Sequence, residues 1–287
     1  MAHPSSAAPF VPSAPPAALV LLGHPVAHSL SPQFQNAALE ACRLPQRYTA
    51  VDTAPDALPA LLAQLARDSL SGSGTAGNVT LPLKELVFGA AAHTSALAQR
   101  VGAVNTFWFD DGALYGHNTD VAGVERAILS LCPDGIAGVP CAVLGAGGSA
   151  AAVLVALQTL GAGPITMWSR TPARVRTLSS RVGVAVTAVP DLADALRPAQ
   201  LVVNATPVGL HDDAMIVQPP MLPADCAVLD LVYRRGETAW VRACRAAGVP
   251  AQDGLRMLVE QGAAAFECWF GIEAPRDVMW RALENRV

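Results

Sequence analysis

The chain has 287 residues, of which 52% are hydrophobic and 15% are charged. This length favours two domains over one, and the composition is that of a folded globular protein rather than a disordered one. The formal net charge of −4 comes from interspersed residues with no basic tract, which argues against nucleic acid or a membrane surface as a partner.

No disulfide framework or metal site is predicted, because the six cysteines are scattered without a C-x-x-C pair. Residues 1–16 are rich in Ala, Pro and Ser and predict a disordered tail. The tail has no basic region before its short apolar run, so we expect no export signal and a cytoplasmic protein. The uncharged segment 135–169 is interrupted by glycines, which indicates a strand, a turn and a helix rather than a membrane span.

Extended and helical patterns alternate along the first 120 residues. In chain order, we predict a strand at 18–22, a helix from Pro32 towards Cys42, an extended segment at 48–51, a helix at 58–67, an extended segment at 77–80, a helix from Pro82 and an extended segment at 104–109. This alternation is typical of α/β proteins.

A second α/β pattern follows. We predict a helix at 121–131, a strand at 141–145, a helix at 149–160, a strand at 165–168, further alternation to Asp253 and a last helix at 255–270. We expect that last helix to pack on the first domain. The prediction is thus an α/β protein in which residues 17–120 and 255–287 form a discontinuous substrate domain. Residues 121–254 form a doubly wound Rossmann-type domain.

The turn after the strand at 141–145 is rich in glycine. It comprises Gly145, Ala146, Gly147, Gly148 and Ser149, between an apolar strand and an apolar helix. Glycines there allow a tight turn and bring backbone N–H groups and a helix N-terminus to a pyrophosphate. Close packing of the helix on the sheet is the alternative explanation. The surrounding strand–turn–helix–strand pattern favours dinucleotide binding.

The end of the next strand bears on which dinucleotide binds. NAD enzymes usually carry an acidic residue there, whereas this chain has Ser169, Arg170 and Thr171, with Arg174 one turn further on if a helix starts at Pro172. A guanidinium and a hydroxyl suit a 2′-phosphate, so NADP is predicted in preference to NAD. Either arginine could instead be an ordinary solvated surface charge.

Lys84 follows an extended segment and Pro82, which we expect to be the first helical residue. A lysine in the first helical turn opposes the helix dipole by about 0.3–1 kcal/mol, so a surface lysine gains nothing from this position. The same field favours the neutral amine that proton transfer needs. We therefore predict a functional lysine, with a solvated surface lysine as the alternative.

Asp120 ends an extended segment just before the predicted helix at 121–131. An N-cap is the simplest explanation of an aspartate at this position. If Asp120 lies near Lys84, its charge opposes the effect of the dipole on the amine, and the two groups titrate as a unit.

Seven motifs in order make the chain resemble the shikimate dehydrogenase family from about residue 19 to 271. They lie at 23–32 (GHPVAHSLSP), 78–84 (NVTLPLK), 102–106 (GAVNT), 116–120 (GHNTD), 145–148 (GAGG), 204–209 (NATPVG) and 254–262 (GLRMLVEQG). That family reduces 3-dehydroshikimate to shikimate with NADPH. The resemblance implies that Lys84 and Asp120 are the catalytic pair, with Lys84 as proton donor to the developing alkoxide and Asp120 as the group that orients the amine and a substrate hydroxyl.

The resemblance also implies the other contacts of a small, polyhydroxylated substrate. Ser29 and Ser31 would hold its carboxylate, and the ring and hydroxyls would be surrounded by Thr80, Asn105, Tyr233 and Gln261. The cofactor would further contact Leu231 and Gly254. The sequence departs from the usual family pattern at Gln35, Ser169, Arg235 and Phe270, of which Gln35 and Arg235 leave room for an altered substrate preference.

Two other functions remain open. A relative that oxidises quinate or an aminated shikimate, with NAD as one possible cofactor, differs only in pocket details. A sensor or scaffold that binds NADP without turnover keeps the same fold but predicts no dependence on Lys84. Either a monomer or a homodimer is compatible with the sequence.

Overall fold

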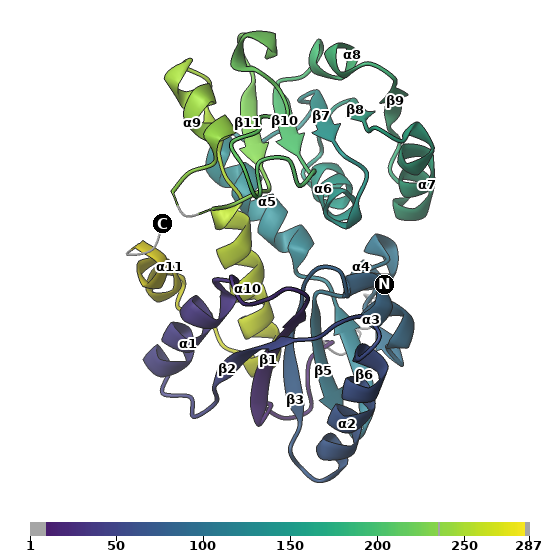
Figure 1. Ribbon diagram of the computed structural model, residues 1–287, viewed down its shortest axis with the longest axis vertical. Helices are drawn as coiled ribbons and strands as arrows, with labels where there is room; N and C mark the ends of the chain where they lie inside the picture. Colours follow the sequence, from purple (N-terminus) through teal and green to yellow (C-terminus); the bar gives the residue numbers. More distant parts are fainter. Residues whose placement is uncertain (1–9, 235, 285–287) are drawn as a thin grey trace, which may run out of the picture.

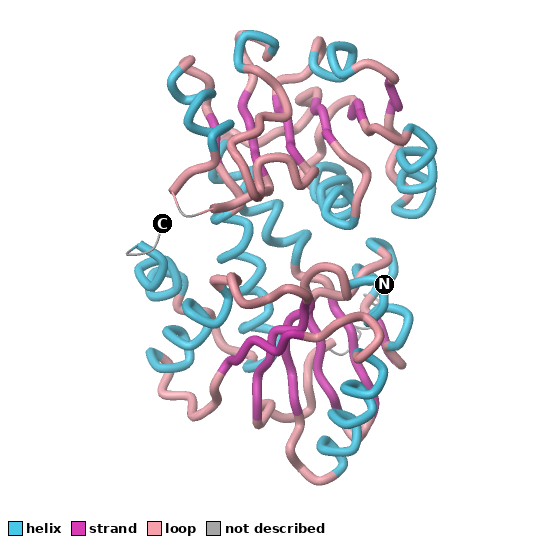
Figure 2. Tube along the Cα trace, in the orientation of Figure 1, coloured by secondary structure: helices cyan, strands magenta, loops and turns pink. Residues whose placement is uncertain are grey.

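The computed structural model describes residues 10–234 and 236–284. Figure 1 shows two α/β halves, one above the other, with helices α5 (Asp120–Leu131) and α10 (Leu255–Phe270) running between them. Each half is built on a six-stranded sheet. Figure 2 shows strands in both halves, with helices around them. The predicted α/β fold class is confirmed. No helix in the described ranges is long and apolar enough to cross a membrane.

The first sheet has the order β2-β1-β3-β5-β6-β4. Its strands are β1 (Ala18–Gly23), β2 (Tyr48–Asp52), β3 (Thr75–Val79), β4 (His93–Thr94), β5 (Thr106–Asp110) and β6 (Ala113–His117). Strands β2 and β3 flank β1 in parallel, whereas β5 runs antiparallel to β3 and β6. The helices of this half before α5 are α1 (Ser31–Ala41), α2 (Leu58–Leu70), α3 (Lys84–Ala90) and α4 (Ala96–Val101).

The second sheet is entirely parallel, with the order β12-β11-β10-β7-β8-β9. Its strands are β7 (Cys141–Leu144), β8 (Ile165–Trp168), β9 (Thr187–Val189), β10 (Leu201–Asn204), β11 (Ala227–Asp230) and β12 (Ala251–Gln252). The helices are α6 (Gly148–Thr159), α7 (Pro172–Val182), α8 (Leu192–Leu196), a 3₁₀ helix (Pro219–Met221) and α9 (Ala239–Ala246). This is the strand order of a doubly wound Rossmann fold. From β7 the chain adds strands first on one side, up to β9, and then on the other side, from β10 to β12. In such folds ligands bind where the strand order reverses, which here is between β7 and β10.

Helix α10 follows β12 but packs against the first sheet. Val259, Ala263 and Phe266 are fully buried in one apolar cluster with Leu19 of β1 and Phe34 of α1. Helix α11 (Arg276–Glu284) follows α10 and packs on α1. The chain therefore returns to its starting half, which is why strands and loops distant in sequence border one cavity.

Three expectations about local structure were wrong. Residues 1–9 lie outside the described residues, but 10–16 are not disordered, since Phe10 packs edge-on against Trp108 and the Ser13 hydroxyl donates to Asp110 Oδ1 (2.7 Å). Helix α3 begins at Lys84 rather than Pro82, because a turn precedes it in which Leu83 N donates to Thr80 O (2.9 Å).

The third correction concerns Asp120, which is the first residue of α5 and not its N-cap; Thr119 occupies the cap position. The Asp120 backbone N–H donates to Asn118 Oδ1 (3.1 Å), so a neighbouring side chain provides the acceptor. The Asp120 carboxylate is thereby left for contacts outside the helix.

Candidate active site

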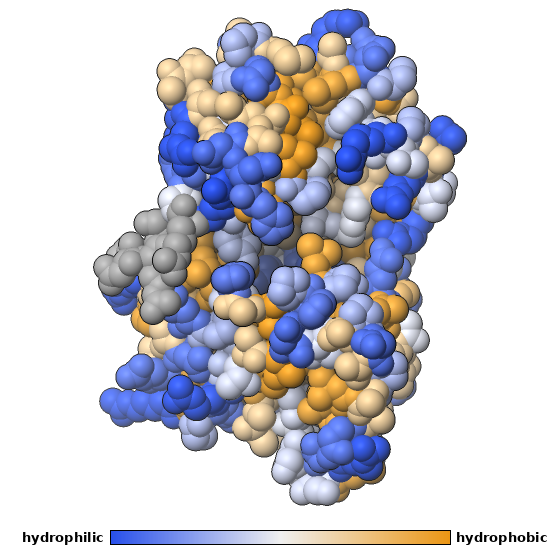
Figure 3. All heavy atoms as spheres, viewed as in Figure 1, coloured by the Kyte–Doolittle hydropathy of each residue, from blue (hydrophilic) through white to orange (hydrophobic). Residues whose placement is uncertain are grey.

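A cavity of about 150 Å³ lies where the two halves meet, and Figure 3 shows the surface hollowed there. Its walls come from both halves and from α10: Leu21, Ser29, Ser31, Asn78, Val79, Thr80, Lys84, Asp120, Ser149, Leu231, Tyr233, Gly254, Met257, Leu258 and Gln261. Nearly every predicted substrate-binding residue is therefore at one place. Asn78, Met257 and Leu258 also line this cavity, although sequence reasoning gave them no role.

Lys84 and Asp120 form an ion pair in this cavity. The Lys84 Nζ lies 2.6 Å from Asp120 Oδ2, and their side chains are 23% and 8% exposed. Lys84 is the first residue of α3 and Asp120 is the first residue of α5, so each lies at a helix N-terminus. The dipole of α5 favours the Asp120 carboxylate, while the dipole of α3 opposes the Lys84 ammonium.

Asn105 lies behind the pair and does not line the cavity. Its side chain is 1% exposed, and its Nδ2 donates to Asp120 Oδ1 (2.8 Å), Thr119 Oγ1 (3.0 Å) and Gln261 Oε1 (3.1 Å). The orientation of the amide is fixed because Asn105 Oδ1 accepts from Thr119 N (2.7 Å). In this structure Asn105 acts as a support for Asp120, so a contact with substrate would require the amide to give up one of these partners.

A buried polar chain continues from Asn105 into the first sheet. Asn78 Nδ2 donates to Asn105 O and to Thr106 Oγ1, both at 3.1 Å, and the Tyr48 hydroxyl donates to Asn78 Oδ1 (2.8 Å). Full burial raises the pKa of Tyr48 well above its usual value, so the hydroxyl remains a donor. Sequence reasoning missed this row of hydrogen-bonded side chains, because isolated polar residues in strands carry no periodic signal.

The predicted carboxylate-binding serines lie at the N-terminus of α1. Ser31 N donates to Ser29 Oγ (3.2 Å), which orients the Ser29 side chain. Thr80 lies at the end of β3, where its methyl group would clash with a Cβ at position 23, only 2.4 Å away. On α10, Gln261 Nε2 donates to Leu258 O (2.8 Å) while its Oε1 faces Asn105.

Tyr233 is the last of the predicted substrate-binding residues. It follows β11, and burial raises the pKa of its phenol, so its hydroxyl stays protonated. A protonated phenol in the cavity wall can donate one hydrogen bond to a polar ligand.

The glycine turn lies between β7 and α6, at the reversal point of the second sheet. Gly145 has φ +111°, and a Cβ there would lie 2.8 Å from Ala205 O, so only glycine fits. A Cβ at Gly147 or Gly148 would meet nothing within 4 Å. Helix α6 has no side-chain cap, so its first N–H groups are available for an anion.

The predicted 2′-phosphate contacts follow β8. Helix α7 starts at Pro172, which is the condition stated above, so Arg174 lies in its first turn, four residues after Arg170. Both arginines are exposed, and no ion pair within the described residues involves either of them. Thr171 N donates to Ser169 Oγ (3.3 Å), which closes the turn that carries Arg170. Two uncommitted cations beside a helix N-terminus suit a phosphate.

Known proteins share this sequence and fold. A relative described as shikimate dehydrogenase (NADP(+)), from Halobacterium salinarum, is 41% identical over 272 residues, which cover 93% of this chain and 98% of the relative. The chain belongs to the shikimate dehydrogenase family. A sequence model described as the shikimate dehydrogenase substrate binding domain matches residues 21–107, and one described as the shikimate 5′-dehydrogenase C-terminal domain matches residues 254–284.

Solved structures of this family have the same fold. The crystal structure of shikimate 5-dehydrogenase from Thermus thermophilus in complex with NADP(H) and shikimate has a TM-score of 0.83 at 40% identity, and the match covers 94% of this chain and 99% of that one. Quinate dehydrogenase from Corynebacterium glutamicum in complex with NAD has the same TM-score of 0.83 at 30% identity, covering 93% and 98%.

Of the departures from the usual shikimate dehydrogenase pattern, Gln35, Ser169 and Phe270 lie in the described residues, and none of the three lines the cavity. Gln35 is fully buried in α1; its Nε2 donates to Gly262 O (2.9 Å), whereas its Oε1 has no partner among the described residues. Phe270 packs on Phe266 with ring centroids 4.8 Å apart. Arg235 lies outside the described residues.

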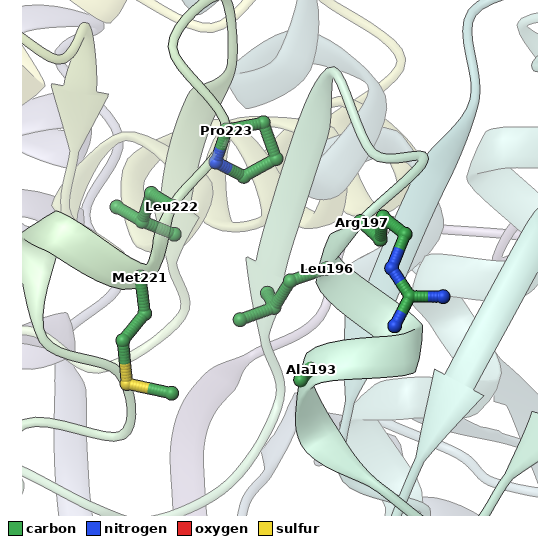
Figure 4. A pocket seen from close by; sticks show the side chains of 6 residues that line it. All are labelled: Ala193, Leu196, Arg197, Met221, Leu222 and Pro223. Atoms are coloured by element: carbon green, nitrogen blue, oxygen red, sulfur yellow. The ribbon is translucent and has the colours of Figure 1, made fainter.

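A second, larger cavity of about 440 Å³ lies away from these residues, between α8 and the 3₁₀ helix. Figure 4 shows that its walls are mainly apolar, with Leu196 facing Met221, while the Arg197 guanidinium extends away from Met221. It contains no acid–base pair, so its size does not make it the reaction site. The described residues contain no cluster of three or more His, Cys, Asp or Glu side chains that could hold a metal ion.

One feature of the sequence adds support for a functional role of Lys84. Lys84 is the only lysine of the chain, so the other 18 of the 19 lysines and arginines are arginines. Arginine stays protonated under all ordinary conditions, whereas an amine can release its proton. The one position that has an amine is thus the one that lies in the cavity beside a carboxylate.

Proposed function

We propose that this chain is an NADP-dependent shikimate dehydrogenase, which reversibly reduces 3-dehydroshikimate to shikimate on the route to chorismate and the aromatic amino acids. The observation that carries the proposal is the Lys84–Asp120 ion pair in a cavity that also reaches the glycine turn at Ser149. The relatives from Halobacterium salinarum and Thermus thermophilus described above support it, because those matches cover 93% and 94% of the chain.

The described residues fit NADP. The uncapped N-terminus of α6 and the open glycines 147 and 148 suit the pyrophosphate, and Arg170 and Arg174 suit the 2′-phosphate. Leu231 and Gly254 would form the cavity wall on which the nicotinamide end rests. When bound, NADPH supplies the hydride for the carbonyl carbon.

Lys84 and Asp120 would carry the proton. As the carbonyl of the substrate becomes an alkoxide, the Lys84 ammonium donates a proton from Nζ to the developing oxyanion. Asp120, 2.6 Å from Nζ, orients the amine and accepts a hydrogen bond from a substrate hydroxyl. Asn105 holds the position of the carboxylate from behind, and Thr119 in turn holds Asn105. Enclosure in the cavity strengthens these interactions because little water competes with them.

The remaining cavity residues would bind the substrate. Ser29 and Ser31 offer hydroxyl donors for its carboxylate, and Thr80, Tyr233 and Gln261 offer hydroxyl and amide groups for its ring hydroxyls. Asn105 would join them if its amide exchanges a protein partner for the substrate.

Domain organisation, assembly and location are part of the same proposal. We assign residues 17–120 and 255–287 to the substrate domain and residues 121–254 to the cofactor domain, with closure of the cleft upon binding. We also expect a cytoplasmic monomer or homodimer. X-ray scattering with and without both ligands measures the closure, and sedimentation measures the assembly. Identical scattering profiles would contradict closure.

Four assays test the proposed reaction. Shikimate or quinate is combined with NADP⁺ or NAD⁺, and the absorbance of the reduced cofactor gives kcat/KM for each pair. We expect the highest value for shikimate with NADP⁺. A preference for quinate or NAD⁺ would place the chain with the quinate-oxidising relatives, which one structural neighbour represents. Cofactor binding without turnover in any pair would favour a sensor.

Cofactor selection should depend on Arg170. Replacement of Arg170 by alanine should weaken NADPH binding by about tenfold or more and leave NADH binding unchanged, since a charge-assisted hydrogen bond to a phosphate contributes about 1.5–3 kcal/mol. Titration of protein fluorescence with each cofactor measures both affinities.

Arg176→Ala is the matched control for this experiment. Arg176 lies on the same helix and is exposed, but two residues after Arg174 its side chain points to the opposite side of α7. We expect it to change neither affinity. Equal losses of NADPH and NADH affinity in Arg170→Ala would contradict a role in recognising the 2′-phosphate.

A further inference from the structure

Two acidic residues stand directly behind one wall of the cavity without lining it. Asp230 ends β11 and is 1% exposed, and Asp253 follows β12. Each of them immediately precedes a cavity residue, Leu231 in the first case and Gly254 in the second. The carboxyl ends of adjacent parallel strands thus bring two carboxylates to the same wall.

The two segments of this wall touch each other. A Cβ at Gly254 would lie 2.2 Å from Leu231 O, and Gly254 N donates to Val232 O (3.0 Å). Their contact fixes Asp230 and Asp253 relative to the cavity. It also explains why position 254 requires glycine.

Asp230 is hydrogen-bonded but not paired with a cation. Its Oδ1 accepts from Asn204 Nδ2 (2.8 Å) and Val232 N (3.1 Å), and its Oδ2 accepts from Thr238 Oγ1 (2.9 Å). No Lys, Arg or His of the described residues forms a salt bridge with it. All three partners donate, so the site is built for an acceptor that is ionised rather than protonated.

The groups around Asp230 do not neutralise it. Burial raises the pKa of Asp230 to about 6, although its three hydrogen bonds act in the opposite direction, and the negative charge of Asp253 adds to the rise. Burial also raises the pKa of Asp253. Arg245 acts in the opposite direction, but its Nε donates to Ala251 O and its Nη1 contacts Glu237. Cys244 is the other titratable group nearby, and its pKa is raised to about 11, so it is neutral.

The position of the reacting ring follows from the proposed function, on which this inference rests. A hydride can reach a carbon beside Lys84 and Asp120 only if the nicotinamide lies in the same cavity. The residues of the second half that line it are Ser149, Leu231, Tyr233 and Gly254. The ring is cationic when oxidised and neutral when reduced, so a charge behind this wall affects the two forms differently.

We propose that the buried Asp230 carboxylate, assisted by Asp253, stabilises the cationic, oxidised form of the cofactor and so favours hydride donation to the substrate. An asparagine at this position could keep most of the same contacts without the charge. In an Asp230→Asn variant, the side-chain oxygen would accept from Asn204 and Val232, and the NH₂ group would donate to Thr238 Oγ1. The role of the charge is therefore separable from the role of the hydrogen bonds.

The test compares the affinities of NADP⁺ and NADPH for the full chain and for Asp230→Asn, without substrate, by isothermal titration at pH 8. We expect the ratio Kd(NADP⁺)/Kd(NADPH) to rise about fivefold or more in the variant, as one unit charge acting over several ångströms at an effective dielectric constant of about 20 requires. The 2′-phosphate is common to both cofactors, so its own contribution cancels from the ratio.

Asp225→Asn provides the matched control. Asp225 is exposed in the turn just before β11, whereas Asp230 is the last residue of that strand, so the two carboxylates lie at opposite ends of β11. This variant has the same net charge as Asp230→Asn, so it should leave the ratio unchanged. An unchanged ratio in Asp230→Asn would overturn the proposal. If both affinities changed equally, the role of Asp230 would be structural only.

A second measurement needs no variant. Asp230 takes up a proton as the pH falls through about 6. In the unaltered chain, the ratio Kd(NADP⁺)/Kd(NADPH) should therefore rise between pH 8 and pH 5.5, and a flat ratio would overturn the proposal. Failure of the proposed function is distinguishable, because the chain would then bind neither cofactor or would not turn over shikimate.

Discussion

Lys84→Ala should lower the turnover of 3-dehydroshikimate by about 10²- to 10⁴-fold, the usual contribution of a positioned proton donor, or about 3–5 kcal/mol of barrier. The loss is expected in kcat, because the proton is transferred only as the alkoxide develops. NADPH should bind with unchanged affinity, since the proposed cofactor contacts lie in the other half of the molecule. Stopped-flow measurement of NADPH oxidation, with fluorescence titration of NADPH, checks both expectations.

Two further variants separate proton donation from charge. Lys84→Arg keeps the cation beside Asp120 but cannot release a proton, so it should be nearly as inactive as the alanine variant. Glu85→Gln, at the next and exposed position, should retain turnover within about twofold, as is usual for surface changes. Turnover by Lys84→Arg close to that of the unaltered chain would disprove proton donation by Lys84.

Asp120→Asn should lower kcat/KM by about 10²-fold or more, at the lower end of the range for acid–base groups. The change leaves the Lys84 ammonium without a counter-charge in a largely enclosed cavity. An asparagine that kept its oxygen towards the Asn105 amide would turn its own NH₂ towards Nζ, so two donors would face each other. Steady-state kinetics should show both a lower kcat and a higher KM for the substrate.

Asp134→Asn is the control for that variant, because Asp134 is exposed beyond the other end of the helix that begins with Asp120. It should leave both constants unchanged. If Asp120→Asn raised KM alone, the carboxylate would be a binding group that does not assist proton transfer. Circular dichroism of both variants shows whether the fold is retained.

The elements predicted with correct ends are those whose ends are marked by particular residues in the sequence. The strand Ile165–Trp168 and the helix Leu255–Phe270 have the predicted bounds, because glycine or proline adjoins them and their apolar residues repeat with one clear period. The parallel order of the second sheet follows from strands alternating with helices. In the first sheet, the antiparallel pair β5–β6 was not predicted, since its pairing is decided by contacts distant in sequence.

The site was predicted less completely than the fold. Motif resemblance identified Lys84 and Asp120, and the structure brings them into contact. The support from Thr119, Asn78 and Tyr48 could not be predicted, because it depends on which strands are neighbours and on the orientation of each amide. The prediction of disorder for residues 10–16 was wrong for a similar reason. Its Pro-rich composition indicates disorder by itself, but Phe10 finds an aromatic partner on β5.

The solitary lysine makes this protein its own spectroscopic probe. Protein grown with ¹⁵N- or ¹³C-labelled lysine contains a single labelled side chain, so one resonance reports on the Lys84 amine without any need for assignment by mutation. Its chemical shift can be recorded in the free protein and again after each ligand is added. Because the amine lies 2.6 Å from Asp120 Oδ2 in the cavity wall, that one signal records how the surroundings of the pair change when the cavity is filled.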